Sequence, residues 1–302
     1  MFYTGALPDR QDKRDFNAEP LLGAAPAVDF ENNPLFLPKP PLWNQNASDA
    51  CVGASWSYYH WQLKGEIFSK RDLFARIAQA YGAYIRDGGV TLVKIGQQTE
   101  TELPDPQFPD ANNMRDKTGL NDQQAIDDRE LNSYSFNNTI DDCAKCIRDF
   151  KGCVFGVVGS ENGWKDKENP TPPKSGEATW GHALYLYGYH LHDGQKCVIA
   201  RSSWSETDHH IKQNYFESGN TFNPWVLIPR SIMEILQVVG EATLVVKNLD
   251  GKYYQIATAP ELYPYVAKVL GLEGKAFGTI SRAEVDLNLG GDLTAGLSFI
   301  SK

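Results

Sequence analysis

Apolar residues recur every three to four positions in the first half of the chain, which is the period of a helix packed against a core. The stretch 51–64 is the clearest example, with apolar positions at Val52, Trp56, Tyr59 and Leu63. Gly65 follows directly, and glycine is a typical helix stop. The pattern predicts an amphipathic helix over 51–64.

Capping residues and periodicity predict further helices. Ser69 and Asp72 form a capping-box-like start to an apolar stripe of Leu73, Phe74, Ile77, Ala78 and Tyr81. The run IRDGGVTLVKIG predicts another short helix, although its two glycines disfavour it. Thr139 is the expected N-cap of the run TIDDCAKCIRDF, a helical pattern whose apolar face is Ile140, Cys143, Ile147 and Phe150.

The second half carries shorter, strand-like apolar runs. These are GCVFGVV, HALYLYGYH, QKCVIARSSW and PWVLIP. Proline-rich polar stretches at 99–122 and 160–180 predict surface loops. Early helices followed by late strands predict an α+β domain built from two packed halves.

The pattern of apolar and turn residues changes near Gly240. The run ATLVVKNLDGKYYQIA predicts a β-hairpin with its turn at Asp250-Gly251. A helix is predicted at 259–272, and Ser281 with Glu284 predicts another helix start. We therefore expect an extended segment at 1–27, a main domain at 28–239 and a small α+β module at 240–302.

Charge and composition exclude some classes of protein. The net charge is −9 and no basic face is visible, so nucleic acid is not an expected partner. No apolar run approaches the roughly 20 residues of a membrane span. The first residues lack the apolar core of a signal peptide. These observations favour a cytoplasmic or virion-associated protein, although the location stays open.

Five cysteines, an odd number, do not suggest a disulfide framework. Cys143 and Cys146 form a CxxC pair, but no second pair follows, so a zinc ribbon is not supported. Their positions on a helical apolar face predict core packing.

Cys51 begins the first predicted helix and follows Gln45 by six positions. A free cysteine is often a small buried hydrophobe, but a helix N-terminus also favours the thiolate form. His182 starts a strand 131 residues later (182 − 51), and Ser202 ends the next strand. Taken alone, His182 is better explained as a buried core histidine. Together with Cys51 and Gln45 it suggests a nucleophile and its base.

Several segments, in order, resemble the papain-like cysteine peptidases over roughly residues 7–235, including bacterial and phage-type members. The segments are VDF at 28–30, NQNASDACVGASW, GAYIRDGG, GHALYLYGY, RSSWS and PWVLIP, with LPDRQDKRDF before them. The resemblance implies a two-lobed fold with a helical half and a β-sheet or barrel half. It also implies a Cys–His separation within about 130–150 residues, which this chain satisfies.

The resemblance implies a role for each site residue. Cys51 is the nucleophile that forms a thioester, and His182 is the acid and base. Gln45 and the Cys51 backbone N–H donate to the oxyanion. Ser202 stands where the family usually has asparagine, so it is expected to orient His182 only weakly, and Trp204 shields that contact. A peptide or protein is then the substrate, and no cofactor or metal is required.

The Ser202 departure keeps two alternatives open. One is a catalytically weak papain-fold protein that acts as a structural or binding component, for instance in a virion, with an assembly partner docking through 240–302. The other is an amidase or acyltransferase acting on cell-wall peptides with the same dyad. Residues 1–27 are also expected to lie across the domain or to block its site.

Two groups of ring-bearing residues have other interpretations. Tyr185, Tyr187 and Tyr189 are expected to be core and cross-strand packing. The segments HLHD and DHH, which contain His190, His192, Asp193, His209 and His210, form either a metal cluster or solvated surface. Solvated surface is the expected outcome, because the first lies in a predicted turn and the second in a polar loop.

Overall fold

The computed structural model describes residues 5–10, 12, 18, 26–130 and 132–228, and in the C-terminal part 234–238, 243–247, 253–257, 278–281, 283 and 289–292. The chain divides into two compact units, Met1–Ile228 and Pro229–Lys302. The sequence placed the corresponding change at residue 240. No described helix is long and apolar enough to cross a membrane.

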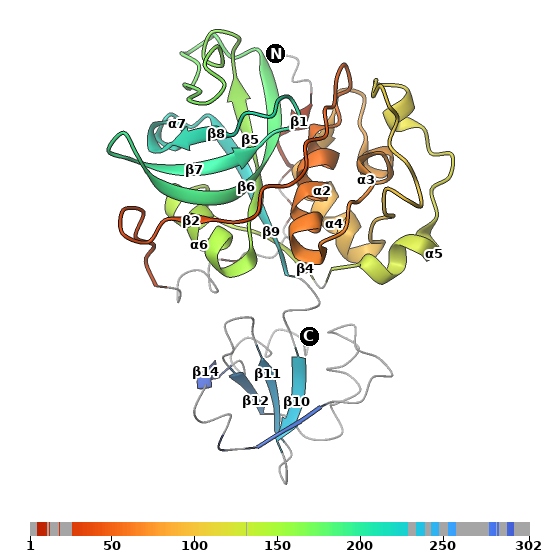
Figure 1. Cartoon of the computed structure of the whole chain (residues 1–302), viewed down its shortest axis with the longest axis vertical. Helices are drawn as coiled ribbons and strands as arrows, with labels where there is room; N and C mark the ends of the chain where they lie inside the picture. The colour runs from red at the N-terminus through yellow and green to blue at the C-terminus, as the bar shows by residue number, and fades with distance from the viewer. Residues whose placement is uncertain are drawn as a thin grey trace. The chain divides into compact units, whose positions relative to one another are not determined.

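The helical half of the first unit is built around α2 (Cys51–Lys64). Around it lie α3 (Lys70–Ile77), α4 (Ile85–Lys94) and the short turns η1 (Asn113–Arg115), α5 (Asp122–Ala125) and η2 (Ile126–Asp128). Figure 1 shows these helices together on one side of the unit, with the sheet on the other. Gly65 ends α2 in the left-handed conformation, as the sequence predicts. Ser69 accepts from the Asp72 backbone N–H at the start of α3, which confirms that cap.

The helix α2 is a central helix and not an amphipathic surface one. Its residues from Cys51 to His60 are all buried, including polar side chains. Two of those polar groups have internal partners: Ser57 Oγ donates to Gly53 O at 2.8 Å, and His60 Nδ1 lies 3.0 Å from Gln97 Oε1. Such partners offset the cost of burying polar groups, so the predicted polar face needs no solvent.

The glycines that disfavoured α4 in the sequence have a packing role. A Cβ at Gly88 would lie 2.2 Å from Trp56 Cδ1, and one at Gly89 would lie 3.1 Å from the same ring. Trp56 Nε1 also donates to Ile85 O at 2.9 Å. The missing side chains let α4 approach the Trp56 ring, which offsets the low helix propensity of glycine.

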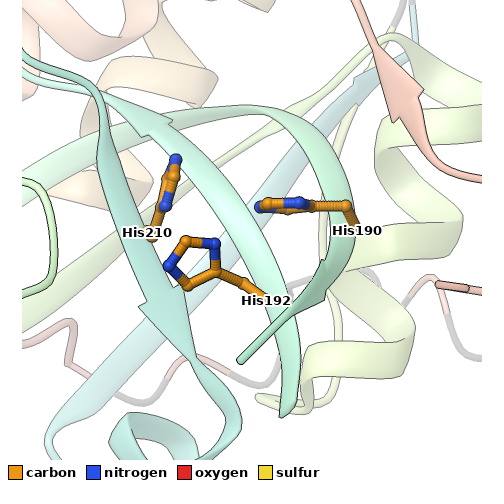
Figure 2. A group of neighbouring side chains, drawn as sticks. All are labelled: His190, His192 and His210. Carbon is orange, nitrogen blue, oxygen red and sulfur yellow. The ribbon is translucent and has the colours of Figure 1, made fainter. Parts of the chain in front are cut away.

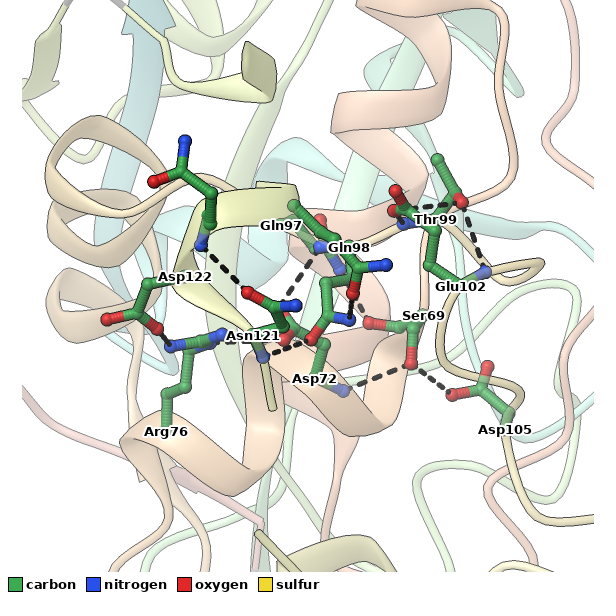
Figure 3. A network of polar contacts seen from close by, with 12 residues as sticks. Ser69, Asp72, Arg76, Gln97, Gln98, Thr99, Glu102, Asp105, Asn121 and Asp122 are labelled. Atoms are coloured by element: carbon green, nitrogen blue, oxygen red, sulfur yellow. Dashed lines mark hydrogen bonds and ion pairs between the residues drawn. The ribbon is translucent and has the colours of Figure 1, made fainter. Parts of the chain in front are cut away.

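A polar network ties the loop around residues 97–105 to α3 (Figure 3). Ser69 Oγ contacts Asp105, and the Gln98 backbone N–H donates to Asp72. Arg76 pairs with Asp72 and Asp122. The predicted stripe of α3 stops at Ile77, and Tyr81 is 57% exposed instead of buried. The helix ends at Ala78, whose extended ψ breaks the period before Tyr81 is reached.

The other half is an antiparallel sheet of seven strands, with β4-β9-β5-β6-β7-β8 in order and β2 on β6. The strands are β2 (Leu35–Phe36), β4 (Asn132–Ser135), β5 (Cys153–Gly159), β6 (Trp180–His192), β7 (Gln195–Arg201), β8 (His209–Lys212) and β9 (Thr221–Ile228). Helix α6 (Ile140–Phe150) packs on this sheet, and α7 (Gln213–Glu217) follows β8. A mixed fold of helices first and an antiparallel sheet second confirms the predicted α+β class.

Two predictions about this half are confirmed and one is wrong. Cys143 and Cys146 are free and buried on the inner face of α6, as the prediction of core packing requires. Tyr185, Tyr187 and Tyr189 are buried, and Tyr185 stacks on Tyr59 with centroids 5.5 Å apart. The segment DHH, predicted to lie in a polar loop, instead runs into the edge strand β8, where His209 and His210 pair with β7.

The second unit is described by its strands. They are β10 (Glu234–Val238), β11 (Thr243–Lys247), β12 (Tyr253–Ala257), β13 (Gly278–Ile280) and β14 (Leu289–Asp292), in the order β13-β10-β11-β12-β14. The antiparallel β11–β12 pair confirms the predicted hairpin strands. The hairpin turn, the helix predicted at 259–272 and the helix start at Ser281–Glu284 lie outside the described residues or only partly within them.

Candidate active site

The Cys51 sulfur lies where the first turn of α2 meets strand β6. Ala50, the N-cap residue, makes no side-chain capping bond, so the first N–H groups of the helix are left for other acceptors. Backbone N–H groups of Cys51, Val52 and Ala183 point at the sulfur and lower the pKa of its thiol. Ala183 directly follows His182, so the thiol sits against the strand that carries the histidine.

Burial outweighs these donors. The Cys51 thiol is fully buried, and burial raises its pKa to about 12, with a smaller contribution from the Asp49 carboxylate. The sequence expectation of a thiolate at the helix N-terminus therefore does not describe this state. The thiol is neutral here because the helix dipole and N–H groups stabilise the anion less than desolvation destabilises it.

An N-terminal strand covers the sulfur. Gly5 bridges Gly181 in parallel, and the Ala83 backbone N–H donates to Gly5 O at 2.9 Å. The next two residues, β1 (Ala6–Leu7), pair with β3 (Ala83–Tyr84). A Cβ at Gly5 would lie 3.0 Å from Cys51 Sγ and 2.8 Å from Gly181 O. We call residues 5–7 the covering segment; only glycine fits at its first position.

His182 is buried and held by two neighbours from the loop after β7. Its Nε2 lies 3.0 Å from Ser202 Oγ. The Trp204 ring stacks on the imidazole, with centroids 3.6 Å apart and planes 18° from parallel. His182 Nδ1 is buried and has no hydrogen-bond partner among the described residues. Burial, with a smaller effect of His209, holds the pKa of His182 well below its usual value, so the ring is neutral.

Gln45 is held by hydrogen bonds to Ser203, in the loop after β7, and to Ser48. Its backbone N–H donates to Ser203 O at 3.0 Å, and its side-chain oxygen accepts from Ser203 Oγ at 2.6 Å. Its Nε2 donates to Ser48 O at 2.7 Å. Because an amide nitrogen has two hydrogens, one Nε2–H remains for a further acceptor.

Aromatic rings form a cavity of about 320 Å³ next to Trp204. Its lining residues are Glu161, Trp164, Lys167, Trp180, Trp204 and His209. The Trp180 and Trp204 rings meet edge to face with centroids 4.8 Å apart. The ring that shields His182 thus also forms a wall of this cavity.

Known structures share this arrangement of elements. Xylellain, a cysteine protease from Xylella fastidiosa, matches with a TM-score of 0.62 at 19% identity, over 75% of this chain and 96% of that one. Procathepsin L2 from the Tenebrio molitor larval midgut matches with a TM-score of 0.56 at 15% identity, over 75% and 78%. Procathepsin B S9 from Trypanosoma congolense matches at 0.55 and 14%, over 75% and 86%.

The protein has the papain-like fold. At these identities the likeness concerns the fold alone. The sequence itself matches no protein-family model and no curated protein.

Within this papain-like fold, the structure brings the predicted residues to one region. His182, Ser202 and Trp204 are in direct contact, and Gln45 joins them through Ser203. Cys51 reaches the same strand through the Ala183 N–H. Sequence reasoning missed Ser203, although it stands next to Ser202 in the quoted motif. It also missed the contact of Gly5 with the thiol, for which the sequence offers no signal beyond a glycine near the start.

Proposed function

We propose that the protein is a cysteine-type peptidase that hydrolyses peptide bonds through Cys51 and His182. The observation that carries the proposal is the position of the Cys51 sulfur, which meets the N–H of Ala183. The adjacent His182 has a buried Nδ1 with no hydrogen-bond partner within the described part of the chain. His182 Nε2 is already engaged by Ser202, which leaves Nδ1 as the nitrogen for the thiol proton.

The proposed reaction begins when a substrate replaces the covering segment. His182 Nδ1 takes the Cys51 proton, and the sulfur attacks the peptide carbonyl carbon. The resulting oxyanion accepts from the spare Gln45 Nε2–H and from the Cys51 N–H. The intermediate collapses to a thioester as His182 protonates the leaving amine. Water, deprotonated by His182, then releases the acid and regenerates the thiol.

The aromatic cavity offers a place for the substrate on the histidine side of the bond. Trp204 separates it from His182, and its other walls are mainly rings. We assign it to a side chain on the leaving-group side of the substrate. The acidic Glu161 and basic Lys167, which also line it, would favour a substrate group that is apolar with a polar tip.

A catalytically weak binding protein is the second candidate. Two observations favour it: Ser202 replaces the usual asparagine, and the thiol is covered and neutral. The same residues would also serve an acyl transfer on cell-wall peptides, so substrate identity must come from experiment.

The test is turnover of a casein or peptide-library substrate by the full chain and by a variant lacking residues 1–7. The deletion keeps Asp9, whose side chain accepts from Trp225 Nε1 at 2.7 Å and from the Arg86 N–H at 3.0 Å. We expect cleavage by the shortened chain and none after Cys51→Ala in the same background. Purified cell wall as a second substrate separates peptidase from amidase action. Absence of product from every substrate, with the fold intact, would favour the binding protein.

A further inference from the structure

Three histidines lie on one face of the sheet, far along β6 from His182. His190 and His192 are two residues apart on β6, so their side chains point to the same face. His210 lies on β8 and pairs with Ile199 of β7, which in turn pairs with Gly188 of β6. The register therefore puts His210 on that same face, two strands away. Figure 2 shows the three rings turned toward a common gap.

The ring nitrogens are close enough to share one ligand. One nitrogen from each histidine lies within 4.8 Å of the other two. Ring centroids are 5.3 Å apart for His190–His192, 5.2 Å for His190–His210 and 4.5 Å for His192–His210. Strand β7 lies between β6 and β8, so the rings approach one another across the intervening strand.

Two nitrogens of the cluster lack a partner. His190 Nε2 and His210 Nδ1 are buried, and neither makes a hydrogen bond within the part of the chain that the structure describes. A buried polar atom left unsatisfied costs about 1–3 kcal/mol, and such atoms call for an explanation. A bound cation would satisfy both nitrogens at once.

The third histidine is oriented from behind. His192 Nε2 lies 3.0 Å from Asn169 Oδ1, which leaves its Nδ1 to face the cluster. Metal-binding histidines usually donate their other ring N–H to an oxygen in this way. His210 is held as well, because its backbone N–H donates to Glu168 O at 2.7 Å.

We propose that His190, His192 and His210 bind one zinc ion, with water at the fourth position. Neutral imidazole suits Zn²⁺ and its late first-row neighbours, and three histidines with an open position are a known zinc set. Tetrahedral Zn–N bonds of about 2.0–2.1 Å require nitrogens about 3.4 Å apart. Small side-chain rotations reach that spacing from the present one. The sequence alone favoured solvated surface, because it gave no sign that His210 lies on a strand of the same sheet as His190 and His192.

The ion would tie the edge strand β8 to β6. It would also tether the loop at 160–179, since Asn169 and Glu168 both contact the cluster residues. This loop carries Trp164 and Lys167 of the aromatic cavity. Zinc would therefore stabilise the sheet edge and the cavity wall without touching the Cys51–His182 region.

The experiment is zinc titration by calorimetry and thermal unfolding, in a Cys51→Ala full-chain background that removes the thiol as a competing ligand. We expect one ion per chain and a raised melting temperature. His192→Asn and His210→Asn should each weaken binding by at least about tenfold, and Asn169→Ala by about tenfold. Lys196→Gln, on the opposite face of β7, is the matched control and should bind as the parent does.

Cobalt absorption distinguishes the ligand set. Co²⁺ bound to the three imidazoles should give visible bands with no thiolate charge-transfer band. A thiolate band would show that the metal binds a cysteine, which would overturn the proposal. So would zinc binding by the triple His→Asn variant as tight as by the parent, or no saturable binding by the parent.

Discussion

At the scale of single residues, Ser202 is the position that decides how well His182 is held. Its Oγ accepts from the Trp204 backbone N–H at 3.1 Å and lies 3.0 Å from His182 Nε2. The Trp204 N–H fixes the oxygen, so the shorter side chain reaches the ring directly. The hydroxyl can accept from Nε2–H, which is the tautomer that leaves Nδ1 free to act as base.

We expect Ser202→Ala to lower kcat about tenfold in the variant lacking residues 1–7, with little change in KM. One lost hydrogen bond of about 1–2 kcal/mol corresponds to that factor. Ser202→Asn should keep activity at or above that of the parent. Steady-state kinetics against pH checks this, because a mere folding defect would reduce the amount of active enzyme without moving the pH profile.

Gln45 is predicted to act only in the transition state. Replacing it by alanine removes one oxyanion donor, so kcat should fall about 10²–10³-fold while KM changes little. Ser203→Ala, which frees the Gln45 side-chain oxygen but keeps its Nε2, should have a smaller effect in the same assay. Equal losses of kcat in the two variants would assign Gln45 a structural role.

At the scale of elements, helix starts and buried strands were predictable because they depend on local signals. Ser69, Thr139 and Gly65 act through neighbours a few residues away. The strands β5, β6 and β9 contain apolar runs, and such runs predict burial directly. Elements set by long-range contacts were not predictable. The edge strand β8 carries a polar sequence and exists because β7 pairs with it, and β1 exists because Gly5 reaches both Gly181 and Ala83.

The covering segment yields a prediction about access to the thiol. Gly5→Ala adds a Cβ that must collide with Gly181 O and Cys51 Sγ, at a backbone φ of 105°. The segment should lift, and iodoacetamide should then alkylate Cys51 faster than in the parent chain. Gly219→Ala is the matched control, because its φ is 70° and no atom lies within 4 Å of the added Cβ. Equal alkylation rates in parent and Gly5→Ala would show that the segment does not limit access.

At the scale of the whole molecule, the main domain was predictable and the placement of its site only in outline. The sequence order of Cys51, His182 and Ser202 suggested one site, and the fold brings their segments together. The protonation state was not predictable, because it depends on burial, to which a segment 46 residues upstream of Cys51 (51 − 5) contributes. The histidine cluster depends on the pairing and register of β6, β7 and β8, which no residue pattern specifies.

Stability should depend on pH through His182. Its pKa is well below the usual value in the folded state, so below pH of about 6.5 the unfolded chain binds the extra proton. This difference in proton binding leaves the free energy of unfolding unchanged above that pH and lowers it progressively as the pH falls. We expect the free energy of unfolding to fall less steeply below pH 6.5 in His182→Gln than in the parent. All seven tryptophans lie before residue 229, so their fluorescence in urea reports the first unit alone.

The reactivity of Cys51 in the chain lacking residues 1–7 tests the central claim most directly. Intact-mass and peptide mapping after iodoacetamide treatment at pH 5–6 give a rate for each cysteine in the folded protein. With the cover removed, the thiolate should form beside His182, so Cys51 should react much faster than Cys143, Cys146, Cys153 and Cys197. His182→Ala should abolish that advantage. If Cys51 reacts as slowly as the four core cysteines although its cover is gone, then residues 51 and 182 do not form a nucleophile–base pair, and the proposed peptidase mechanism is wrong.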